Sequence, residues 1–280
     1  MSGSGGGKLT LPEEINRVLY PQGEVYEADL SVADIQEEQE RFYRQQGYLA
    51  VKDVLADSDI ESALEAIMEH IFAEPPAVKV QFVRPKSELE GDEERELAVR
   101  KLYEFVDVDD RLRAIAYHPQ VLAVVERMLG GQAKLVQDVA LLKPPKGGGE
   151  KPWHQDMAYG ALCYDQPVIG VWLALDEAGL DNGCMQLIPR SHMNGGIPHY
   201  AERDWQLCDT VVPVERNVAV PLAPGSALFF HGLLMHGTAN NFSQKRRRAL
   251  QFHYAPADAE KIGAKEYKRM FTSELTKAEC

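Results

Sequence analysis

The chain has 280 residues, and its 30 Lys and Arg against 43 Asp and Glu give a formal net charge of −13. With 45% hydrophobic and 26% charged residues, it has the composition of a globular protein that can bury a large core. No apolar run approaches the length of a membrane span, and residues 1–8 are rich in Gly and Ser, unlike the apolar core of a signal peptide. The acidic balance argues against a phosphate-backbone binder. We therefore expect a cytoplasmic protein with no membrane or nucleic-acid partner.

The cysteine pattern gives no sign of a disulfide framework. Cys163, Cys184, Cys208 and Cys280 form no CxxC pair and lack the spacing of a zinc ribbon. Because cytoplasmic thiols are kept reduced, we expect four reduced cysteines.

The N-terminal segments show little regularity at first and helical patterns later. Residues 1–30 carry little apolar periodicity and are expected to be weakly ordered. Residues 31–46 are predicted to form a helix that ends at Gly47. A short strand is expected to follow over residues 48–51.

Two further helices are predicted before residue 134. Apolar residues recur at helical spacing between residues 60 and 72, and Ser58 with Glu61 has the spacing of a capping box. A second helix is predicted over residues 119–129, with a proline near its start and Gly130 past its end.

From residue 134 onward the pattern changes to short β-like runs separated by Pro, Gly, Asn and Asp turns. These runs cover residues 134–143, 168–175, 184–189, 218–222, 226–231 and 248–255. Helices first and strands later predict a mainly β fold with flanking helices, in which helices pack outside an antiparallel barrel or jelly roll. We expect one domain over residues 31–280, with a helical part (31–133), a β core (134–256) and a C-terminal tail (257–280).

Among the eight His, the informative one is His154, which stands two residues before Asp156. Residues two apart on extended chain point to the same side, so both side chains can reach one point. With a second His from elsewhere they would form the two-His-one-carboxylate set that binds Fe(II) and leaves positions open. His236 is the best candidate, because it follows a strand and precedes a glycine. His231 and His253 compete for this role.

A short basic run at residues 245–248 is the exception to the acidic balance. A metal with open positions can bind a dicarboxylic keto acid, whose far carboxylate then needs a cation, and Arg binds carboxylates bidentately. Alternation along the strand lets Arg247 point into the barrel only if Arg246 and Arg248 point outward. The alternative is a solvated basic hairpin.

Taken in order, several segments resemble the phytanoyl-CoA dioxygenase family over roughly residues 31–256. They are His154-Gln155-Asp156, Trp172, Asp181-Asn182-Gly183-Cys184, Ile188-Pro189-Arg190-Ser191-His192, Pro224 to Phe230, His236-Gly237 and Arg247. Two positions depart from the family pattern: Arg190 stands where a Gly is usual, and Ser226 where an Asp is usual. We expect His192 to hold its loop by hydrogen bonds.

The resemblance implies a double-stranded β-helix (jelly roll, cupin-like) core and the cofactors Fe(II), 2-oxoglutarate and O2, with ascorbate as a possible reductant. It implies that His154, Asp156 and His236 bind iron and that Arg247 holds the 2-oxoglutarate carboxylate. Three further positions match residues at the cosubstrate, namely Lys101, Gln155 and Trp172. Gln137 lies on the strand before the Pro-Pro turn and could point into the same cavity.

The implied activity is oxidation of an unactivated C–H bond in a small organic molecule, with release of succinate and CO2. The carboxylate of Asp156 predicts hydroxylation, desaturation or cyclisation, since related halogenases leave that position empty for halide. One alternative is a non-catalytic cupin-like binding protein. Another is a nucleic-acid demethylase of the same superfamily, which the net charge disfavours. The substrate, whether acyl-CoA or free molecule, and the oligomeric state stay open; segments 157–166 and 193–205 are expected at the barrel mouth.

Overall fold

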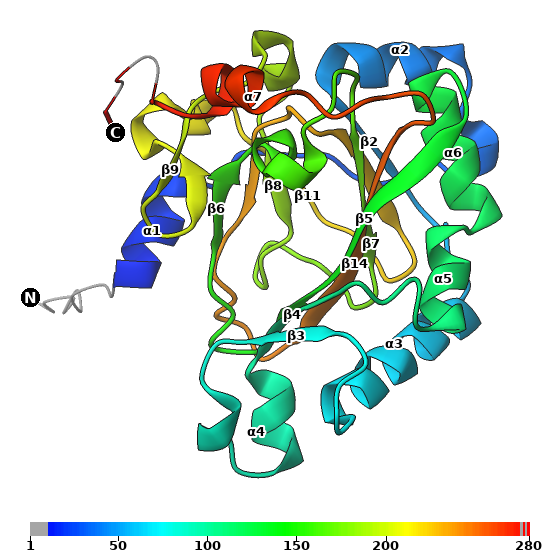
Figure 1. Cartoon of the computed structure of the whole chain (residues 1–280), viewed down its shortest axis with the longest axis vertical. Coiled ribbons are helices and arrows are strands. Elements are labelled where there is room, and N and C mark those ends of the chain that lie inside the picture. Colours follow the sequence, from blue (N-terminus) through cyan, green and yellow to red (C-terminus); the bar gives the residue numbers. More distant parts are fainter. Residues whose placement is uncertain (1–10, 275–276, 278) are drawn as a thin grey trace, which may run out of the picture.

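The computed structural model describes residues 11–274, 277 and 279–280. Two sheets face each other, with helices around them (Figure 1). The larger sheet has the strand order β2 (Tyr48–Val51), β12 (Ala227–His231), β7 (Ile169–Ala174), β14 (Arg247–Pro256), β5 (Ala133–Lys143), β4 (Val99–Tyr103) and β3 (Lys79–Phe82). The smaller has the order β1 (Glu24–Val25), β11 (Val218–Val220), β8 (Met185–Leu187), β13 (His236–Thr238) and β6 (Lys151–His154).

The pairing between strands is antiparallel in both sheets except where β1 lies parallel to β11. A separate hairpin joins β9 (His199–Ala201) to β10 (Trp205–Leu207). Two facing, mostly antiparallel sheets with helices outside form a jelly-roll core, so the predicted fold class is confirmed.

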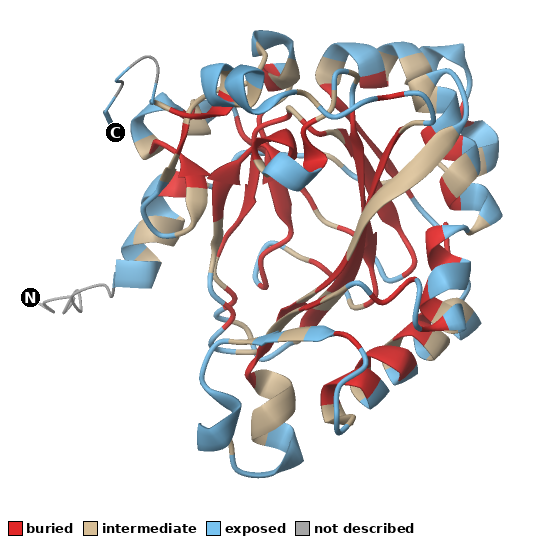
Figure 2. Cartoon of the chain, in the orientation of Figure 1, coloured by how far each residue is buried: buried red, intermediate tan, exposed pale blue. Residues whose placement is uncertain are grey.

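Helices cover the outer face of the larger sheet: α2 (Glu37–Gln46), α3 (Asp57–Phe72), α5 (Asp110–Ala116) and α6 (Pro119–Leu129). Successive strand residues point to opposite faces, so alternate residues such as Leu250 and Phe252 of β14 pack against these helices in the main core. Residues of the other face, such as Trp172 and Phe230, pack toward the smaller sheet. Figure 2 shows the buried residues concentrated in the two sheets and the inner sides of the helices.

The predicted helix over residues 31–46 is two elements. A 3-10 turn (Val32–Asp34) comes first, and α2 begins at Glu37 after Gln36, whose backbone N–H donates to the side chain of Gln39 (2.9 Å). α2 ends at Gly47, which has a φ of 87°. A Cβ there would lie 2.5 Å from Nδ1 of His192, so both the backbone angle and the space require glycine.

The capping contact of α3 differs from the one expected. The helix begins at Asp57, and the carboxylate of Asp59 accepts a hydrogen bond from the backbone N–H of Ala56 (3.1 Å). Ser58 and Glu61 therefore lie one or more positions inside the helix and do not form the capping box. In contrast, α6 has the predicted bounds, with Pro119 first and Gly130 at its C-terminal cap.

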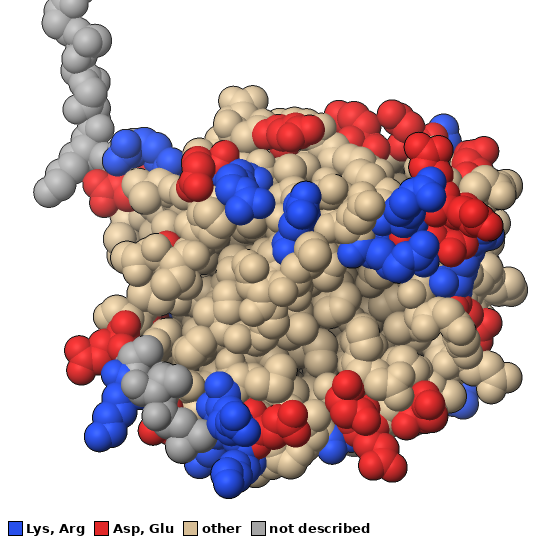
Figure 3. All heavy atoms as spheres, turned by 90° about the horizontal axis from the view of Figure 1, so that it is seen from above, with Lys and Arg blue, Asp and Glu red and all other residues tan. Residues whose placement is uncertain are grey.

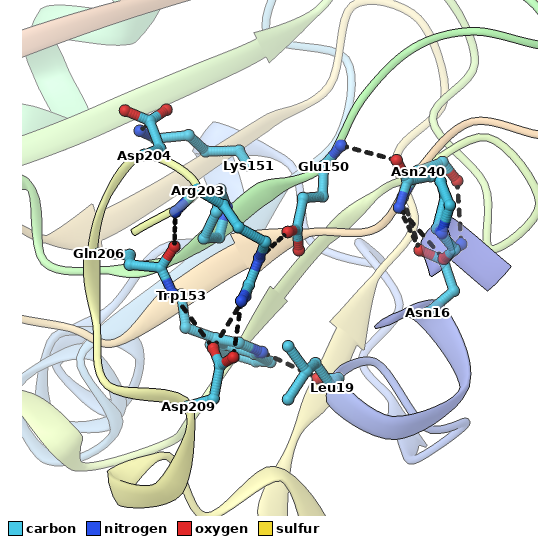
Figure 4. A network of polar contacts seen from close by, with 12 residues as sticks. Asn16, Leu19, Glu150, Lys151, Trp153, Arg203, Asp204, Gln206, Asp209 and Asn240 are labelled. Carbon is cyan, nitrogen blue, oxygen red and sulfur yellow. Dashed lines mark hydrogen bonds and ion pairs between the residues drawn. The ribbon is translucent and has the colours of Figure 1, made fainter. Parts of the chain in front are cut away.

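Residues 11–30, which were expected to be weakly ordered, are fastened to the barrel by tertiary contacts, while residues 1–10 lie outside the described residues. α1 (Leu11–Leu19) contacts the barrel through Asn16, which accepts a hydrogen bond from the side chain of Asn240 (2.8 Å). The indole of Trp153 donates to the carbonyl of Leu19 (2.8 Å) (Figure 4). These partners lie far away in the sequence, so local periodicity could not reveal them.

The expectation of four reduced thiols is wrong for two of them. Cys208 and Cys280 form a disulfide, with their Cα atoms 5.3 Å apart. Cys163 and Cys184 are free and buried. The bonded pair is separated by 72 residues, so only the fold can bring the two cysteines together. The last helix of the chain is α7 (Ala264–Phe271).

No helix among the described residues is long and apolar enough to cross a membrane. On the face seen in Figure 3, Lys and Arg side chains are interspersed with Asp and Glu and leave a largely uncharged central area.

Candidate active site

Three buried side chains converge between β6 and β13. His154 at the end of β6 lies directly opposite His236 at the start of β13, and their ring centroids are 4.1 Å apart. Oδ1 of Asp156, just after β6, is 3.3 Å from Nε2 of His154 and 3.5 Å from Nε2 of His236. The three donor atoms lie within 4.8 Å of one another. This donor set fits a divalent metal such as Fe(II).

The hydrogen bonds of both histidines fix the nitrogen that faces Asp156. Nδ1 of His154 is 2.8 Å from the carbonyl of Pro152, and Nδ1 of His236 is 2.9 Å from the carbonyl of Leu234. Because a carbonyl only accepts, each Nδ1 must donate, which leaves each Nε2 lone pair for a metal. Burial, together with the neighbouring His236 and Lys151, lowers the pKa of His154 to about 3, so this ring is neutral.

The second oxygen of Asp156 is held by the larger sheet. Oδ2 accepts hydrogen bonds from Nε2 of His253 (2.8 Å) and Nε2 of Gln251 (3.1 Å), both on β14. Burial alone would raise the pKa of Asp156, but His236 and His253 outweigh it and keep that pKa well below the ordinary value. His253 was an alternative candidate for the second histidine ligand of iron, but in the structure it holds the carboxylate of Asp156. The sequence analysis did not identify Gln251, although it lies two residues before His253 and shares its face of the strand.

The other competitor, His231, lies away from this cluster. Its ring is 5.0 Å from that of His192, and burial lowers its pKa to about 4. Nε2 of His192 donates to the carbonyl of Arg44 (3.1 Å), as expected for a residue that holds its loop. Arg190, where the family pattern has Gly, adopts the left-handed conformation with a φ of 68°.

The three side chains open into a cavity of about 350 Å³ between the sheets. Lys101, Gln137, Trp172 and Arg247 all line it. The cross-strand register explains their convergence, because His253 lies opposite Gln137 and Gln251 lies opposite Trp172. Alternation therefore turns one face of β5, β7 and β14 toward the cavity.

Arg247 lies in the cavity wall without a charged partner among the described residues. Its guanidinium lies 5.2 Å from the ring centroid of Trp172, and its Nε and Nη1 are buried without a hydrogen-bond partner. Burial lowers its pKa to about 10, so it stays charged at neutral pH. A buried guanidinium with free N–H groups is a fitted receptor for a carboxylate.

The rest of the basic run is neutralised at the surface. Arg246 donates to Glu96 (2.7 Å), Arg248 donates to Asp176 (2.8 Å), and Lys245 pairs with Glu177 (2.8 Å). Arg247 is thus the inward member of the run, which decides between the two alternatives that the sequence left open.

Gln155 is not among the described residues that line the cavity. Its amide donates to the carbonyls of Gly195 (2.9 Å) and Leu233 (2.7 Å), and its oxygen accepts from the N–H of Ile197 (2.9 Å). The alternation that brings His154 and Asp156 to one side turns the residue between them to the other. Gln155 braces the loop near residue 196, and its expected contact with the cosubstrate stays a prediction.

Positive groups surround the cavity on the side of β4 and β6. Burial, with the charges of Lys151 and Arg100, lowers the pKa of Lys101 to about 8. Lys151 and Arg100 both contact Asp204, at 2.8 and 3.0 Å (Figure 4 shows Lys151 beside Asp204). Lys151 also donates to the hydroxyl of Tyr159.

These contacts bring parts of the two expected mouth segments together, because Tyr159 belongs to 157–166 and Asp204 to 193–205. Tyr164 does not take part in these contacts; the ammonium groups of Lys134 and Lys261 lie 5.5 and 5.8 Å from its ring centroid.

Comparisons with known proteins agree with this geometry. A family model described as phytanoyl-CoA dioxygenase (PhyH) matches residues 43–249. Human peroxisomal phytanoyl-CoA dioxygenase is 27% identical over 261 residues, which cover 88% of this chain and 75% of that protein. A probable phytanoyl-CoA dioxygenase of Caenorhabditis elegans is 27% identical over 242 residues, which cover 79% and 75%.

Two solved structures share the fold. The epimerase SnoN, in complex with Fe3+, alpha ketoglutarate and nogalamycin RO, has a TM-score of 0.64 and 22% identity, with 81% of this chain and 86% of that chain covered. The carbocyclase SnoK from nogalamycin biosynthesis has a TM-score of 0.64 and 23% identity, with 89% and 93% covered.

Proposed function

The chain belongs to the phytanoyl-CoA dioxygenase family, and from that premise we propose that it oxidises an unactivated C–H bond of a small organic molecule. Its enzyme class is that of the 2-oxoglutarate-dependent non-haem iron dioxygenases, with iron and 2-oxoglutarate as cofactors. The observation that carries the proposal is the convergence of two imidazoles and a carboxylate across one cavity from the unpaired guanidinium of Arg247.

The residues present fit both cofactors. His154, Asp156 and His236 would hold the iron through two Nε2 atoms and Oδ1. Arg247 would bind the far carboxylate of 2-oxoglutarate, with Trp172 as the wall behind it. When bound, the two cofactors would supply an oxidative decarboxylation: O2 and 2-oxoglutarate are consumed, succinate and CO2 are released, and the substrate is oxidised.

The chain's own residues orient the groups that would hold the cofactors. His253 and Gln251 hold Asp156 so that a single oxygen faces the histidines. Lys101 and Gln137 add a cation and an amide to the cavity wall near the cosubstrate. Because Asp156 fills the carboxylate position, we propose hydroxylation, desaturation or cyclisation as the outcome and not halogenation.

The test is aerobic incubation of the purified chain with Fe(II), 2-oxoglutarate and ascorbate while succinate is measured. Slow succinate formation without a substrate, and faster formation when a compound from a library of small organic molecules is added, would support the proposal. Asp156→Ala is the matched control, since it keeps Arg247 and the cavity but loses a metal donor. Complete silence of a protein that binds the metal would favour the alternative, a non-catalytic cupin-like binding protein.

The substrate would enter past Tyr159 and Lys101, where the cavity wall combines aromatic, aliphatic and basic side chains. Relatives are named for phytanoyl-CoA; for this chain we propose only a small organic molecule, and the library is to contain free acids beside acyl-CoA esters. A cytoplasmic location stays a prediction, because the human relative is named peroxisomal, and imaging of a tagged full-length chain tests it.

A further inference from the structure

Lys143, the last residue of β5, is a buried lysine that the proposed chemistry has not used. It is 4% exposed and lines the cavity. In the register of β5 with β14 it lies directly opposite Arg247. Like charges directly opposite each other on neighbouring strands repel, and neither side chain forms an ion pair with a carboxylate in the described part of the chain.

This arrangement is costly for a protein that binds no anion there. Burial, with the charge of Arg247, holds the pKa of Lys143 well below its ordinary value. Both side chains line the same cavity as the metal donor His236. A bound carboxylate would favour the protonated form of Lys143 and would compensate the charges of both side chains together.

The hydrogen bonds of Lys143 point to what it does. Its ammonium donates to Oγ1 of Thr238 (2.9 Å) and to the carbonyl of Ala239. An ammonium only donates, so Thr238 accepts through Oγ1, and its own hydroxyl hydrogen must be directed elsewhere. Thr238 is buried, lines the cavity and lies two residues after His236 on β13. Its hydroxyl is thereby left as a donor beside the cavity.

Gly148 leaves room for the side chain of Lys143. A Cβ on Gly148 would lie 2.0 Å from Cγ of Lys143, so only a glycine at that position lets the lysine stem pass. Asn241, which pairs with Gly148 in an isolated bridge, holds the adjoining turn through bonds to the carbonyls of Pro144 (3.0 Å) and Lys245 (2.8 Å). The ammonium is therefore held in place by its surroundings.

We propose that Lys143 is a positioning residue for the far carboxylate of the keto-acid cosubstrate: it fixes the Thr238 hydroxyl as a donor and supplies a second positive charge beside Arg247. This inference deepens the proposed function and rests on it. The ligand class that Lys143 selects is a dicarboxylate with a 2-keto group at one end, in preference to a monocarboxylic keto acid of the same length.

The test compares two keto acids that differ only at the far end. The Fe(II)-loaded full chain is titrated without O2 with 2-oxoglutarate or with 2-oxovalerate, which has the same five-carbon chain but no far carboxylate. Binding is followed by the visible absorption band that a 2-keto acid forms on Fe(II). The variants are Lys143→Met and Thr238→Val, alone and together, and the matched control is Lys146→Met, an exposed lysine three residues further on.

Lys143→Met should weaken 2-oxoglutarate binding about 10- to 100-fold, the range expected for a lost charge-assisted contact. It should leave 2-oxovalerate binding within about twofold, because that acid has no group to be held there. The double variant should lose less than the sum of the single losses, because both residues serve one contact. Lys146→Met should bind both acids as the unaltered chain does.

Equal weakening of both acids by Lys143→Met would overturn the inference and assign the lysine a general structural role, and so would unchanged binding of 2-oxoglutarate. Failure of the proposed function is a different result: the unaltered, iron-loaded chain would then form no absorption band with either acid.

Discussion

The two faces of strand β14 are made from alternating residues of one segment, and they differ in almost every physical property. Leu250 and Phe252 pack against the helices in the main apolar core. Arg247, Gln251 and His253 line the cavity. Both faces are buried, since Phe252 is 0% and Arg247 4% exposed. The two faces therefore differ in the kind of group that is buried. One face buries apolar side chains, and the other buries polar and charged side chains along the cavity.

This difference separates stability from function within a single strand. Burial of apolar surface contributes roughly 25 cal/mol per Å², whereas a buried charge without a partner destabilises the fold. Nε and Nη1 of Arg247 and Nδ1 of His253 are buried, and none of them has a hydrogen-bond partner in the described part of the chain. Local conflicts of this kind are expected where a protein binds a ligand. The comparison predicts that variants of the two faces will fail in different assays.

The largest effect is expected where the polar face supports the metal donors. Asp156→Ala should weaken iron binding by more than about 100-fold, because even an outer partner of a metal ligand is worth about 10–100-fold. Succinate formation should fall with it, while circular dichroism stays that of the unaltered fold. Iron content after dialysis and turnover of 2-oxoglutarate are the measurements. Full iron occupancy with measurable turnover would remove Asp156 from the site.

On the apolar face, Phe252→Ala should lower the free energy of unfolding by about 3–5 kcal/mol, since a large buried side chain is replaced by a cavity. Urea unfolding measures the loss. Because Phe252 points away from the cavity, the molecules that remain folded should bind iron with nearly unchanged affinity. A variant that keeps its stability but loses iron would contradict the separation of the two faces.

Arg247→Met should weaken the binding of 2-oxoglutarate and at the same time stabilise the ligand-free fold. The affinity for 2-oxoglutarate should fall by about 100-fold or more, because a bidentate charged contact is lost. The free energy of unfolding of the ligand-free chain should rise by about 1–3 kcal/mol, since an unpaired buried charge is replaced by an apolar side chain of similar length. Arg246→Met, on the outer side of the same strand end, is the control for a lost surface ion pair. A marked loss of stability in Arg247→Met would show that the guanidinium is structurally satisfied.

His253→Leu should weaken iron binding about 10–100-fold through loss of the contact that orients Asp156. Gln251→Leu, which removes the longer of the two contacts, should weaken it less. Once iron is saturating, the KM for 2-oxoglutarate should be close to that of the unaltered chain in both variants, because neither contacts the far carboxylate. Iron titrations and steady-state assays at two iron concentrations distinguish this from a general loss of folding, which would change both quantities.

Much of this comparison could be predicted from the sequence, because alternation along a strand is a local property. The opposite orientations of Arg247 and its two arginine neighbours and the shared side of His154 and Asp156 follow from the period of two, and the bounds of α6 follow from Pro and Gly signals. Which side of the strand faces the cavity was left open by the sequence. The same rule also predicts that Gln155 faces away from the side that His154 and Asp156 share, and its contacts with the loop near residue 196 agree with that.

The remaining features depend on contacts between distant segments. Lys143 is recognisable as part of the site only through the register that sets it opposite Arg247 and through its bond to Thr238. The disulfide between Cys208 and Cys280 and the docking of α1 likewise join residues far apart in the chain. Local propensity carries no information on such pairs, so a single sequence could not have predicted them.

The smallest predicted effect lies outside both faces, at the start of α3. Asp59→Ala should lower the free energy of unfolding by about 0.5–2 kcal/mol, because the N–H of Ala56 loses its acceptor. Ser58→Ala should change it by less than about 0.5 kcal/mol, since Ser58 is an exposed residue inside the helix and not its cap. Urea unfolding of the two variants measures both values. Iron and 2-oxoglutarate binding should be unchanged in either variant, because α3 lies on the outer side of the sheet, away from the cavity. A larger loss of stability in Ser58→Ala than in Asp59→Ala would restore Ser58 and Glu61 as the capping pair.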